Sequence, residues 1–316
     1  MSMIHDSLVG YIVGDCLGVP IKSTKREQLF KKPVVNMMGN GNFDVDKGVW
    51  SDDTALTLAT MDSIIKCKRL NYDSMAIKYC DWINKGKYTS TGYVFDIGTT
   101  TRFSLMKFWS IKKNALICGN SESIADDNNS LTRMMPIAFF LNSHDYLNVL
   151  NEVNNVSSIT HSNSVVRLGC YLYVNYMIKL IDEMNTKKKI NTIKKNCFNY
   201  LKQLNLKDYF SEETISKYSR ILDGSLLKSD INSIRSNSYI VNTLESVLWI
   251  INNTNSFEES LIGAVNLGGC TDTIGALTGS IAGILYGYDN IPERWINDIS
   301  KLSYAEKICN IFEELL

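Results

Sequence analysis

Residues 268–287 read GGCTDTIGALTGSIAGILYG, and this stretch is the strongest indication of the fold. Four of its glycines recur at every fourth position: Gly275, Gly279, Gly283 and Gly287. This spacing places them on one face of a helix over about 271–287. Each glycine costs a helix about 0.5–1 kcal/mol relative to alanine, so close packing against another backbone or access to a ligand must offset the loss. Membrane helices dimerise through similar faces, but a helix of this length that begins with Asp272 is predicted to be buried and tightly packed.

The rest of the chain is also predicted to be helical. Apolar side chains recur at helical spacing in seven further segments: 4–17, 54–67, 74–85, 132–141, 164–182, 241–252 and 257–266. Convincing alternating strands are missing, so the predicted fold class is all-α. We expect loops over 24–49 and 86–101, and the weakest pattern lies in 183–235. Since no linker or internal repeat is evident, residues 1–316 are predicted to form one compact domain.

The composition argues against several classes of function. The 33 basic residues balance 33 acidic ones, so nucleic-acid binding through a broad basic surface is not expected. The eight cysteines form no C-x-x-C pair, which is typical of free thiols in a reducing compartment. No signal peptide is evident, and no uncharged apolar stretch reaches the roughly 20 residues that span a bilayer. We therefore predict a cytoplasmic monomer that binds neither nucleic acid nor membrane.

Two acidic segments, far apart in the sequence, each stand at the start of a predicted helix. The first is Ser51-Asp52-Asp53, and the second contains Asp272 and Thr273. Taken alone, each segment is typical of a helix N-cap, because these side chains accept hydrogen bonds from the first free N–H groups and negative charge is favoured there. Taken together, they could supply the octahedral set of oxygens that Mg²⁺ prefers. We therefore expect the two helix starts to face each other, with these five residues as metal ligands.

Two further segments are candidates for ligand contacts. In the segment 96–102, Gly98 is followed by three threonines, and such a turn can hold a phosphate if a helix follows. Asp96 is either a structural cap or a polar contact in the site. Thr160-His161 precedes another predicted helix. A lone histidine is more often a structural hydrogen-bonding residue than a functional one, and both interpretations stay open here.

Together these segments resemble the ADP-ribosylglycohydrolases, which include the dinitrogenase-reductase-activating glycohydrolases and the ADP-ribosylarginine hydrolases. The resemblance begins at Gly14-Asp15-Cys16-Leu17-Gly18-Val19-Pro20 and covers most of the chain. Five motifs then follow in the family's order: 50–54, 96–102, 133–136, 160–161 and 268–287. The resemblance implies a compact all-α domain with two Mg²⁺ ions at the base of a cleft. It also implies an activity that releases ADP-ribose from a modified side chain or a related compound.

The resemblance further implies roles for individual residues. Asp52, Asp53 and Asp96 would be catalytic, and Asp96 would meet the guanidinium group of an arginine adduct. The metal ligands would be Ser51, Asp52, Asp53, Asp272 and Thr273. The contacts to substrate would come from Gly98, Thr99, Thr100, Asn128, Arg133, His161, Gly269 and Cys270. The partner would be ADP-ribose or an ADP-ribosylated protein.

Four positions depart from the family's usual residues. Cys270 replaces an aspartate ligand, and because thiols bind Mg²⁺ poorly, one of the two metal positions loses a ligand. Lys22 stands where many members have glutamate, Asn129 replaces a glycine, and Thr132 replaces a methionine. Two hypotheses follow: a magnesium-dependent hydrolase that prefers arginine adducts, and a catalytically weakened protein that binds ADP-ribose. An isoprenoid synthase is disfavoured because its Asp-Asp-x-x-Asp motif is missing.

Overall fold

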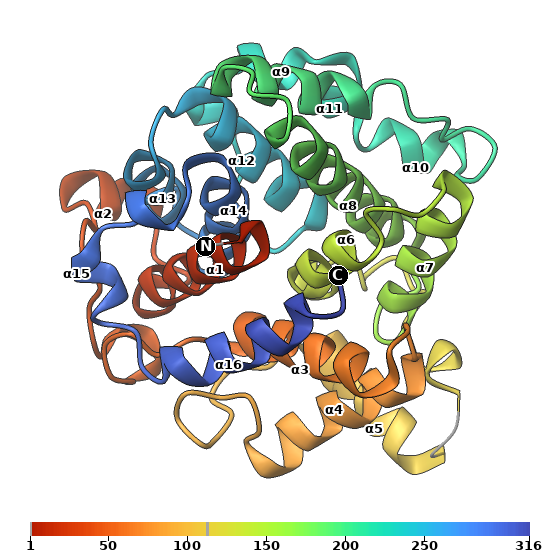
Figure 1. Ribbon diagram of the computed structural model, residues 1–316. Helices are drawn as coiled ribbons and strands as arrows, with labels where there is room; N and C mark the ends of the chain where they lie inside the picture. Colours follow the sequence, from red (N-terminus) through yellow and green to blue (C-terminus); the bar gives the residue numbers. More distant parts are fainter. Residues whose placement is uncertain (1, 112–113) are drawn as a thin grey trace.

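The computed structural model describes residues 2–111 and 114–316 as an assembly of helices (Figure 1). Within these ranges the structure contains no strand, and extended pairing is limited to isolated bridges such as that between Asn40 and Val45. The predicted all-α class is therefore confirmed. In the same ranges, no helix combines the length and the apolar character needed to cross a membrane.

Two helices from opposite ends of the chain form the centre of the fold. Helix α1, Met3–Gly18, lies against helix α14, Thr271–Tyr286 (Figure 1). A Cβ atom added to Gly14 would stand 2.0 Å from the carbonyl oxygen of Gly275, so no side chain fits between the two backbones. The same close approach recurs at Gly10, Gly279 and Gly283. The predicted backbone packing is therefore confirmed for Gly275, Gly279 and Gly283.

Gly287 is the exception on that face. Helix α14 ends at Tyr286, one residue before the end of the predicted range 271–287. Gly287 leaves the helix with a φ of +78°, a conformation that favours glycine. An added Cβ atom would meet only Asp6 Oδ2, at 3.8 Å. Its role is therefore to end the helix, not to pack against α1.

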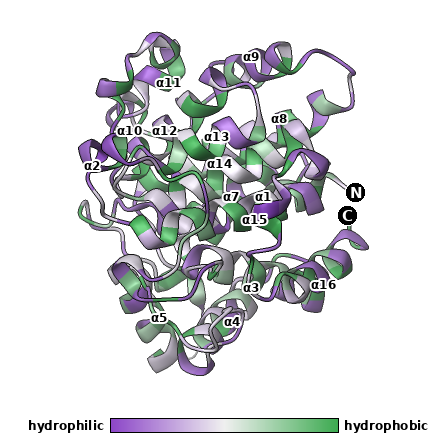
Figure 2. Cartoon of the chain, turned by 90° about the vertical axis from the view of Figure 1, so that its left-hand side faces the viewer, coloured by the Kyte–Doolittle hydropathy of each residue, from purple (hydrophilic) through white to green (hydrophobic). Residues whose placement is uncertain are grey.

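The other helices enclose this central pair. Helix α3, Asp52–Cys67, packs on α16, Leu302–Glu313, while α12, Ile240–Asn253, and α13, Phe257–Val265, both contact α14. Helix α8, Ser164–Met184, packs on α12 in turn. Hydrophobic residues dominate inner helices such as α14, and hydrophilic residues dominate outer ones such as α2 (Figure 2). The arrangement brings the starts of α3 and α14 together around α1.

Every predicted helix is present, with small differences at the ends. The segment predicted as 74–85 is α4, Tyr72–Lys85. The segment predicted as 132–141 is divided into a 3₁₀ turn, Thr132–Met134, and a short helix α6, Met135–Phe140. Pro136 stands in the first turn of α6, where its missing N–H group costs no hydrogen bond.

The structure also contains helices that the sequence did not predict. One lies inside the predicted loop 24–49, and another begins inside the predicted loop 86–101. These helices are α2 (Arg26–Lys31), α5 (Thr99–Ile111), α7 (Tyr146–Ser158), α9 (Ile190–Leu201), α10 (Glu212–Ser216), α11 (Ser219–Asp223), α15 (Glu293–Ile296) and α16. Further 3₁₀ turns span Val19–Ile21, Gly41–Phe43, Ala115–Ile117, Asn128–Ser130, Ser225–Lys228, Ile231–Ser233 and Tyr288–Asn290.

Candidate functional site

The two acidic helix starts meet, as expected. Thr273 Oγ1, in the first turn of α14, donates a hydrogen bond of 2.8 Å to Asp53 Oδ2, in the first turn of α3. These two residues are 220 positions apart in the sequence. Ser51, Asp52 and Asp272 are buried beside them, each at most 3 % exposed. The segments therefore share one interior site, and their role as metal ligands stays a prediction.

The capping interpretation holds for Ser51 but not for the carboxylates. Ser51 is the N-cap of α3, and its Oγ accepts a hydrogen bond of 3.2 Å from the N–H of Asp53. By contrast, the Oδ1 atoms of Asp52, Asp53 and Asp272 are buried and have no hydrogen-bond partner. Buried carboxylate oxygens without donors are costly, so their negative charge is available to a cation.

Asp15 completes this group of buried carboxylates, although it is not among the site residues predicted from the sequence. It follows Gly14 in α1, so the glycine crossing carries it to the start of α3. Its Oδ2 accepts a hydrogen bond of 2.6 Å from Thr54 Oγ1, and bonds of 3.1 Å from the N–H groups of Thr54 and Ser51. The only signal in the sequence was its place inside the motif 14–20. We call Asp15, Asp52, Asp53 and Asp272 the acidic cluster.

Crowding and burial raise the pKa values of the acidic cluster. Burial raises the pKa of Asp15 to about 7, the charge of Asp272 adds to the rise, and the hydrogen bonds that Asp15 accepts reduce it. Burial likewise raises the pKa of Asp52 and of Asp53 well above the ordinary value, with neighbouring carboxylates adding to the effect. Like charges in a low-dielectric interior cannot all stay ionised without a compensating cation.

One ammonium group enters the acidic cluster. Lys22 Nζ lies 2.5 Å from Asp96 Oδ2 and 2.7 Å from Asp272 Oδ2. Burial alone would lower the pKa of Lys22, but the surrounding carboxylates, with Asp272 first, raise it well above the ordinary value. Asp96, which was predicted to meet the guanidinium group of a substrate, is therefore paired with a cation of the chain itself.

The loop that carries Lys22 is tied to the start of α14. The N–H of Ser23 donates to the carbonyl of Gly269 at 2.7 Å, and the N–H of Gly269 donates to the carbonyl of Thr24 at 3.0 Å. Gly269 has a φ of +72°, and an added Cβ atom would stand 2.2 Å from the carbonyl oxygen of Ser236. Gly269 therefore shapes the backbone beside the acidic cluster, and its predicted contact with substrate stays a prediction.

The chemistry of the donors fits a hard cation. Asp52, Asp53 and Asp272 offer carboxylate oxygens, which Mg²⁺ prefers. Burial, followed by the charge of Asp272, raises the pKa of the Cys270 thiol to about 12, so this group stays protonated and is a poor ligand. Throughout the part of the chain that the structure describes, no three His, Cys, Asp or Glu side chains are drawn together as ligands. The carboxylates fit Mg²⁺ by their chemistry and their free oxygens, not by a preformed ligand cage.

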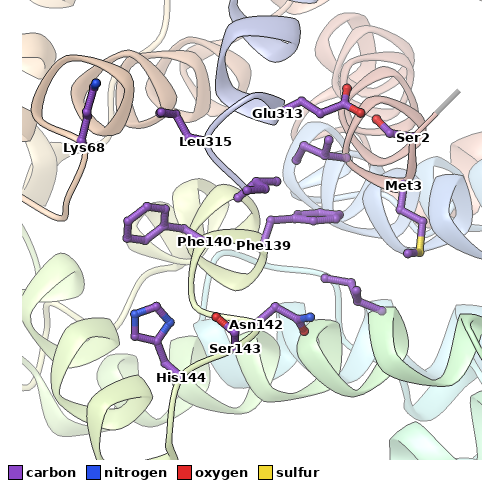
Figure 3. A pocket seen from close by; sticks show the side chains of 13 residues that line it. Ser2, Met3, Lys68, Phe139, Phe140, Asn142, Ser143, His144, Glu313 and Leu315 are labelled. Carbon is purple, nitrogen blue, oxygen red and sulfur yellow. The ribbon is translucent and has the colours of Figure 1, made fainter.

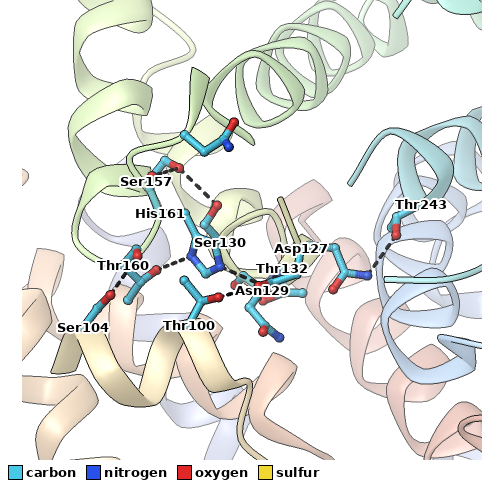
Figure 4. Close-up of polar contacts among 12 residues, drawn as sticks. Thr100, Ser104, Asp127, Asn129, Ser130, Thr132, Ser157, Thr160, His161 and Thr243 are labelled. Atoms are coloured by element: carbon cyan, nitrogen blue, oxygen red, sulfur yellow. Dashed lines mark hydrogen bonds and ion pairs between the residues drawn. The ribbon is translucent and has the colours of Figure 1, made fainter. Parts of the chain in front are cut away.

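A second polar cluster lies at the start of α5 (Figure 4). Asp127 accepts a hydrogen bond of 2.7 Å from Thr100 Oγ1 and lies 2.9 Å from His161 Nε2. His161 Nδ1 lies 2.7 Å from Thr160 Oγ1, which accepts a hydrogen bond of 2.6 Å from Arg133. Because arginine only donates, the hydroxyl of Thr160 can donate to Nδ1, and an N–H at Nε2 can donate to Asp127. We call these five residues the histidine network.

The contacts of His161 and Arg133 are those of positioning residues. Neither side chain has exposed surface. Arg133 also donates to the carbonyl of Asn129 at 3.2 Å, and its guanidinium lies 5.2 Å from the ring centroid of Tyr79. These contacts agree with the supporting role expected for Arg133 and with the structural interpretation of His161. Their predicted contact with substrate stays a prediction.

The two predicted substrate loops touch each other. A Cβ atom added to Gly98 would stand 1.8 Å from Asn129 Oδ1, so the Asn129 side chain would have to move to admit any other residue. Asn128 Nδ2 donates to Thr243 Oγ1 at 2.8 Å. Thr99 begins α5 and is exposed, while Thr100 and Thr101 are buried. The expected helix after the turn is present, and phosphate binding by the turn stays a prediction.

A separate hollow of about 570 Å³ lies away from these residues (Figure 3). Residues near both ends of the chain line it, among them Ser2, Met3 and Leu315, together with Phe139 and Phe140. The predicted site residues are not among those that line it. Its mixture of aromatic and polar side chains lacks the carboxylate density of the acidic cluster, so we do not place the site there.

Comparisons with known proteins identify the family. A model of the ADP-ribosylglycohydrolase family matches residues 2–316. The ADP-ribosylarginine hydrolase Tri1 of Serratia proteamaculans is 30 % identical over 312 residues, which is 98 % of this chain and 77 % of that protein. The ADP-ribosyl-[dinitrogen reductase] glycohydrolase of Rhodospirillum rubrum is 24 % identical over 302 residues, which is 94 % of this chain and 91 % of that protein.

A solved structure shows the same fold. It is described as an ADP-ribosylglycohydrolase-related protein complex and superposes with a TM-score of 0.80 at 22 % sequence identity. The match covers 99 % of this chain and 97 % of the other. Because the family model matches residues 2–316, the chain belongs to the ADP-ribosylglycohydrolase family of hydrolases.

Proposed function

We propose that this chain releases ADP-ribose from modified arginine side chains by magnesium-dependent hydrolysis. The observation that carries the proposal is the acidic cluster, in which Asp52, Asp53 and Asp272 each keep a buried oxygen without a donor. The choice of arginine is supported by a relative named ADP-ribosylarginine hydrolase, which matches 98 % of this chain.

The metal would be held by Asp52, Asp53 and Asp272, with the hydroxyl groups of Ser51 and Thr273 beside them. When bound, Mg²⁺ supplies positive charge that neutralises these carboxylates and orients the ribose hydroxyls and the water. The chain presets part of this arrangement, because the hydrogen bond of 2.8 Å from Thr273 fixes Asp53 before any ligand arrives.

Hydrolysis breaks the bond between the anomeric carbon of the ribose and the arginine nitrogen. A water molecule attacks that carbon and loses a proton, while the leaving nitrogen gains one. Asp52, as a buried carboxylate, provides a base for the proton of the water. Asp96 lines the same hollow as Asp52, where it can accept hydrogen bonds from the guanidinium group. A carboxylate has two oxygens, and Lys22 takes only the Oδ2 of Asp96.

The start of α5 would receive the diphosphate of ADP-ribose. Its first residue, Thr99, is exposed, and the helix dipole favours an anion at this end. Thr100, the next residue, is fixed to Asp127 by a hydrogen bond of 2.7 Å. The histidine network therefore holds the helix start in position without itself needing to touch the ligand.

The alternative function is a protein that binds ADP-ribose without turnover. The thiol of Cys270 and the ammonium group of Lys22 favour it. The thiol is a poorer ligand for Mg²⁺ than a carboxylate, and the ammonium group offsets the negative charge of Asp272. The two functions share the binding site and differ in the chemical step.

A release assay combined with calorimetry separates the two functions. The assay follows ADP-ribose released from ADP-ribosyl-arginine during a magnesium titration, and calorimetry measures the binding of ADP-ribose under the same conditions. We expect release that stops in a chelator and returns when Mg²⁺ is added back. Tight binding without release at millimolar Mg²⁺ would reject the hydrolase and favour the binding protein.

The preference for arginine rests on Asp96 and has its own test. Asp96→Asn should reduce kcat/KM for an arginine adduct by about tenfold more than for a serine adduct, because a charge-assisted hydrogen bond is lost only with the guanidinium group. Asp46→Asn is the matched control, since Asp46 is exposed. Equal losses for both adducts would remove the reason for choosing arginine.

A further inference from the structure

Lys22 is the cation that the fold itself places beside the acidic cluster. Its Nζ bridges Asp96 Oδ2 at 2.5 Å and Asp272 Oδ2 at 2.7 Å, and its side chain is 22 % exposed. The ring of Phe43 lies 5.9 Å from the ammonium group and covers it from another direction. An ammonium group that bridges two carboxylates in this way provides positive charge where an ion would otherwise be needed.

The backbone holds Lys22 in this position from two sides. Its carbonyl accepts a hydrogen bond from Asn42 Nδ2, and the next residue, Ser23, donates to Gly269 at 2.7 Å. The hydroxyl of Thr271 at the start of α14 donates to Gly18, on the other side of Lys22 in the sequence, at 2.7 Å. Removing Nζ from its place would leave Asp272, which has no exposed surface, without its counter-charge.

The oxygens that remain free lie in one group. On the side of Lys22, the Oδ2 atoms of Asp96 and Asp272 lie within ion-pair distance of Nζ, and residue 270 offers a thiol, which binds hard cations less well than a carboxylate does. The Oδ1 atoms of Asp52, Asp53 and Asp272 are buried and have no hydrogen-bond partner. Because Nζ of Lys22 lies against the Oδ2 atoms of Asp96 and Asp272, a second cation at this place would have to displace the ammonium group.

We propose that Lys22 supplies, as a fixed ammonium group, the positive charge on the Asp96 side of Asp272, and that the acidic cluster consequently binds one divalent cation and not two. This inference rests on the proposed function for the presence of a metal, and it adds the number of ions and the source of the second charge. The ammonium group of Lys22 already lies against two carboxylates, so one cationic position is filled before any metal is added.

Binding of Mn²⁺ alone, without ADP-ribose, tests the number of ions. Equilibrium dialysis gives the number of ions per chain, and electron paramagnetic resonance distinguishes an isolated ion from a coupled pair. The wild-type chain should bind one Mn²⁺ with the spectrum of an isolated ion. Two ions per chain, or the spectrum of a coupled pair, would overturn the inference.

Variants of Lys22 sharpen the measurement. The double change Lys22→Glu with Cys270→Asp replaces the ammonium group and the thiol by carboxylates, and it should bind two ions with the spectrum of a coupled pair. Lys66→Glu is the control for the first of these changes, because it makes the same charge change as Lys22→Glu at an exposed position in the last turn of α3 and should still bind one ion. A double variant that folds and still binds one ion would contradict the assigned role of Lys22.

A milder variant covers the case in which the double variant fails to fold. Lys22→Gln removes the charge and keeps most of the side chain, so the single Mn²⁺ should bind about tenfold more tightly once the like charge is gone. Unchanged or weaker binding would count against the proposal. ADP-ribose release is measured on the same samples. Release with two bound ions would overturn this inference alone, whereas one bound ion without release would overturn the proposed hydrolase alone.

Discussion

The acidic cluster and the histidine network are both buried polar groups in the same fold, but only one of them satisfies itself. In the histidine network, Asp127 accepts hydrogen bonds from two side chains, and His161 uses both ring nitrogens. In the acidic cluster, Asp52 and Asp53 each retain an oxygen without a donor. The difference indicates that the histidine network positions the site, whereas the acidic cluster is the one suited to take a ligand.

The pKa values of the buried carboxylates shift in opposite directions in the two clusters, because their neighbours differ. Burial alone would raise the pKa of Asp127, but hydrogen bonds from His161 and Thr100 and the interaction with the imidazole lower it to about 2. Asp15 also accepts several hydrogen bonds, yet burial and the nearby charge of Asp272 raise its pKa to about 7. Donors stabilise a buried carboxylate, and a neighbouring carboxylate destabilises it. The acidic cluster thus stores an unfavourable charge that a cation relieves.

The largest expected effect comes from Asp53→Asn. This change should reduce kcat/KM for ADP-ribosyl-arginine by about 10²–10³-fold, because it removes charge from the reacting site. The free energy of unfolding in a chelator should stay the same or rise, because the variant removes a buried negative charge. Activity assays and denaturant unfolding measure the two quantities. A large loss of stability would show that Asp53 is structural, and the contrast with the histidine network would fail.

The same isosteric change in the histidine network should have the opposite outcome. Asp127→Asn should lower the free energy of unfolding by about 1–3 kcal/mol, because its new N–H group faces a donor and leaves a buried group unsatisfied. Activity per folded molecule should fall far less than in Asp53→Asn. If Asp127→Asn were as inactive as Asp53→Asn and fully stable, the assignment of positioning and reacting groups would have to be reversed.

Lowering the pH should remove part of the free energy of unfolding that the histidine network contributes. The pKa of Asp127 is lowered in the folded state, so its contribution is present above the unfolded value near pH 4 and is lost as pH falls toward about 2. The difference in unfolding free energy between wild type and Asp127→Asn should therefore shrink by about 1–2 kcal/mol from pH 5 to pH 2.5. A constant difference over this range would mean that Asp127 is not held ionised by its partners.

Cys270→Asp gives the smallest expected effect. A carboxylate at this position should tighten Mg²⁺ binding by about tenfold, because affinity follows the charge of the ligands. Cys67→Asp at the end of α3 is the matched control and should leave the affinity unchanged. Calorimetry with Mg²⁺ measures both. An unchanged affinity in Cys270→Asp would show that residue 270 lies outside the coordination shell.

The local parts of the site could be predicted from the sequence. Ser51 is of a residue type favoured at N-caps and stands before a stretch with helical periodicity, and in the structure it is the N-cap of α3. The glycines of α14 predicted a close backbone approach, and Gly14 and Gly275 meet in that way. Such patterns depend only on residues within a few positions of each other, so one sequence is enough to detect them.

Contacts between distant elements could not be predicted in this way. Asp15 lies within a helix whose residues are nearly all buried, and no local pattern separates it from its neighbours. Lys22 is recognisable in the sequence as a departure from the family's usual residue. Its bridge from Asp96 to Asp272, however, depends on how three segments fold together. Asp127 can be recognised as part of the site only through its contacts with Thr100, 27 residues earlier in the chain, and His161, 34 residues later.

The missed helices have a related cause. Helix α7 is rich in asparagine, which has a low intrinsic preference for helices. Its apolar residues Val149, Leu150, Val153 and Val156 nevertheless form a buried face. Packing against α8 therefore overrides the local preference. Helix α2 has only six residues, too few to show a period.

The crossing of α1 and α14 also determines when the molecule can acquire its activity. Thr271 bonds to Gly18 across 253 positions of sequence, and contacts of such long range form slowly because a large loop must close first. During synthesis the apolar α1 emerges early and must wait for its partner near the end of the chain. A nascent chain that ends before residue 271 therefore holds three of the four carboxylates of the acidic cluster but lacks Asp272, so the cluster is completed only late in synthesis.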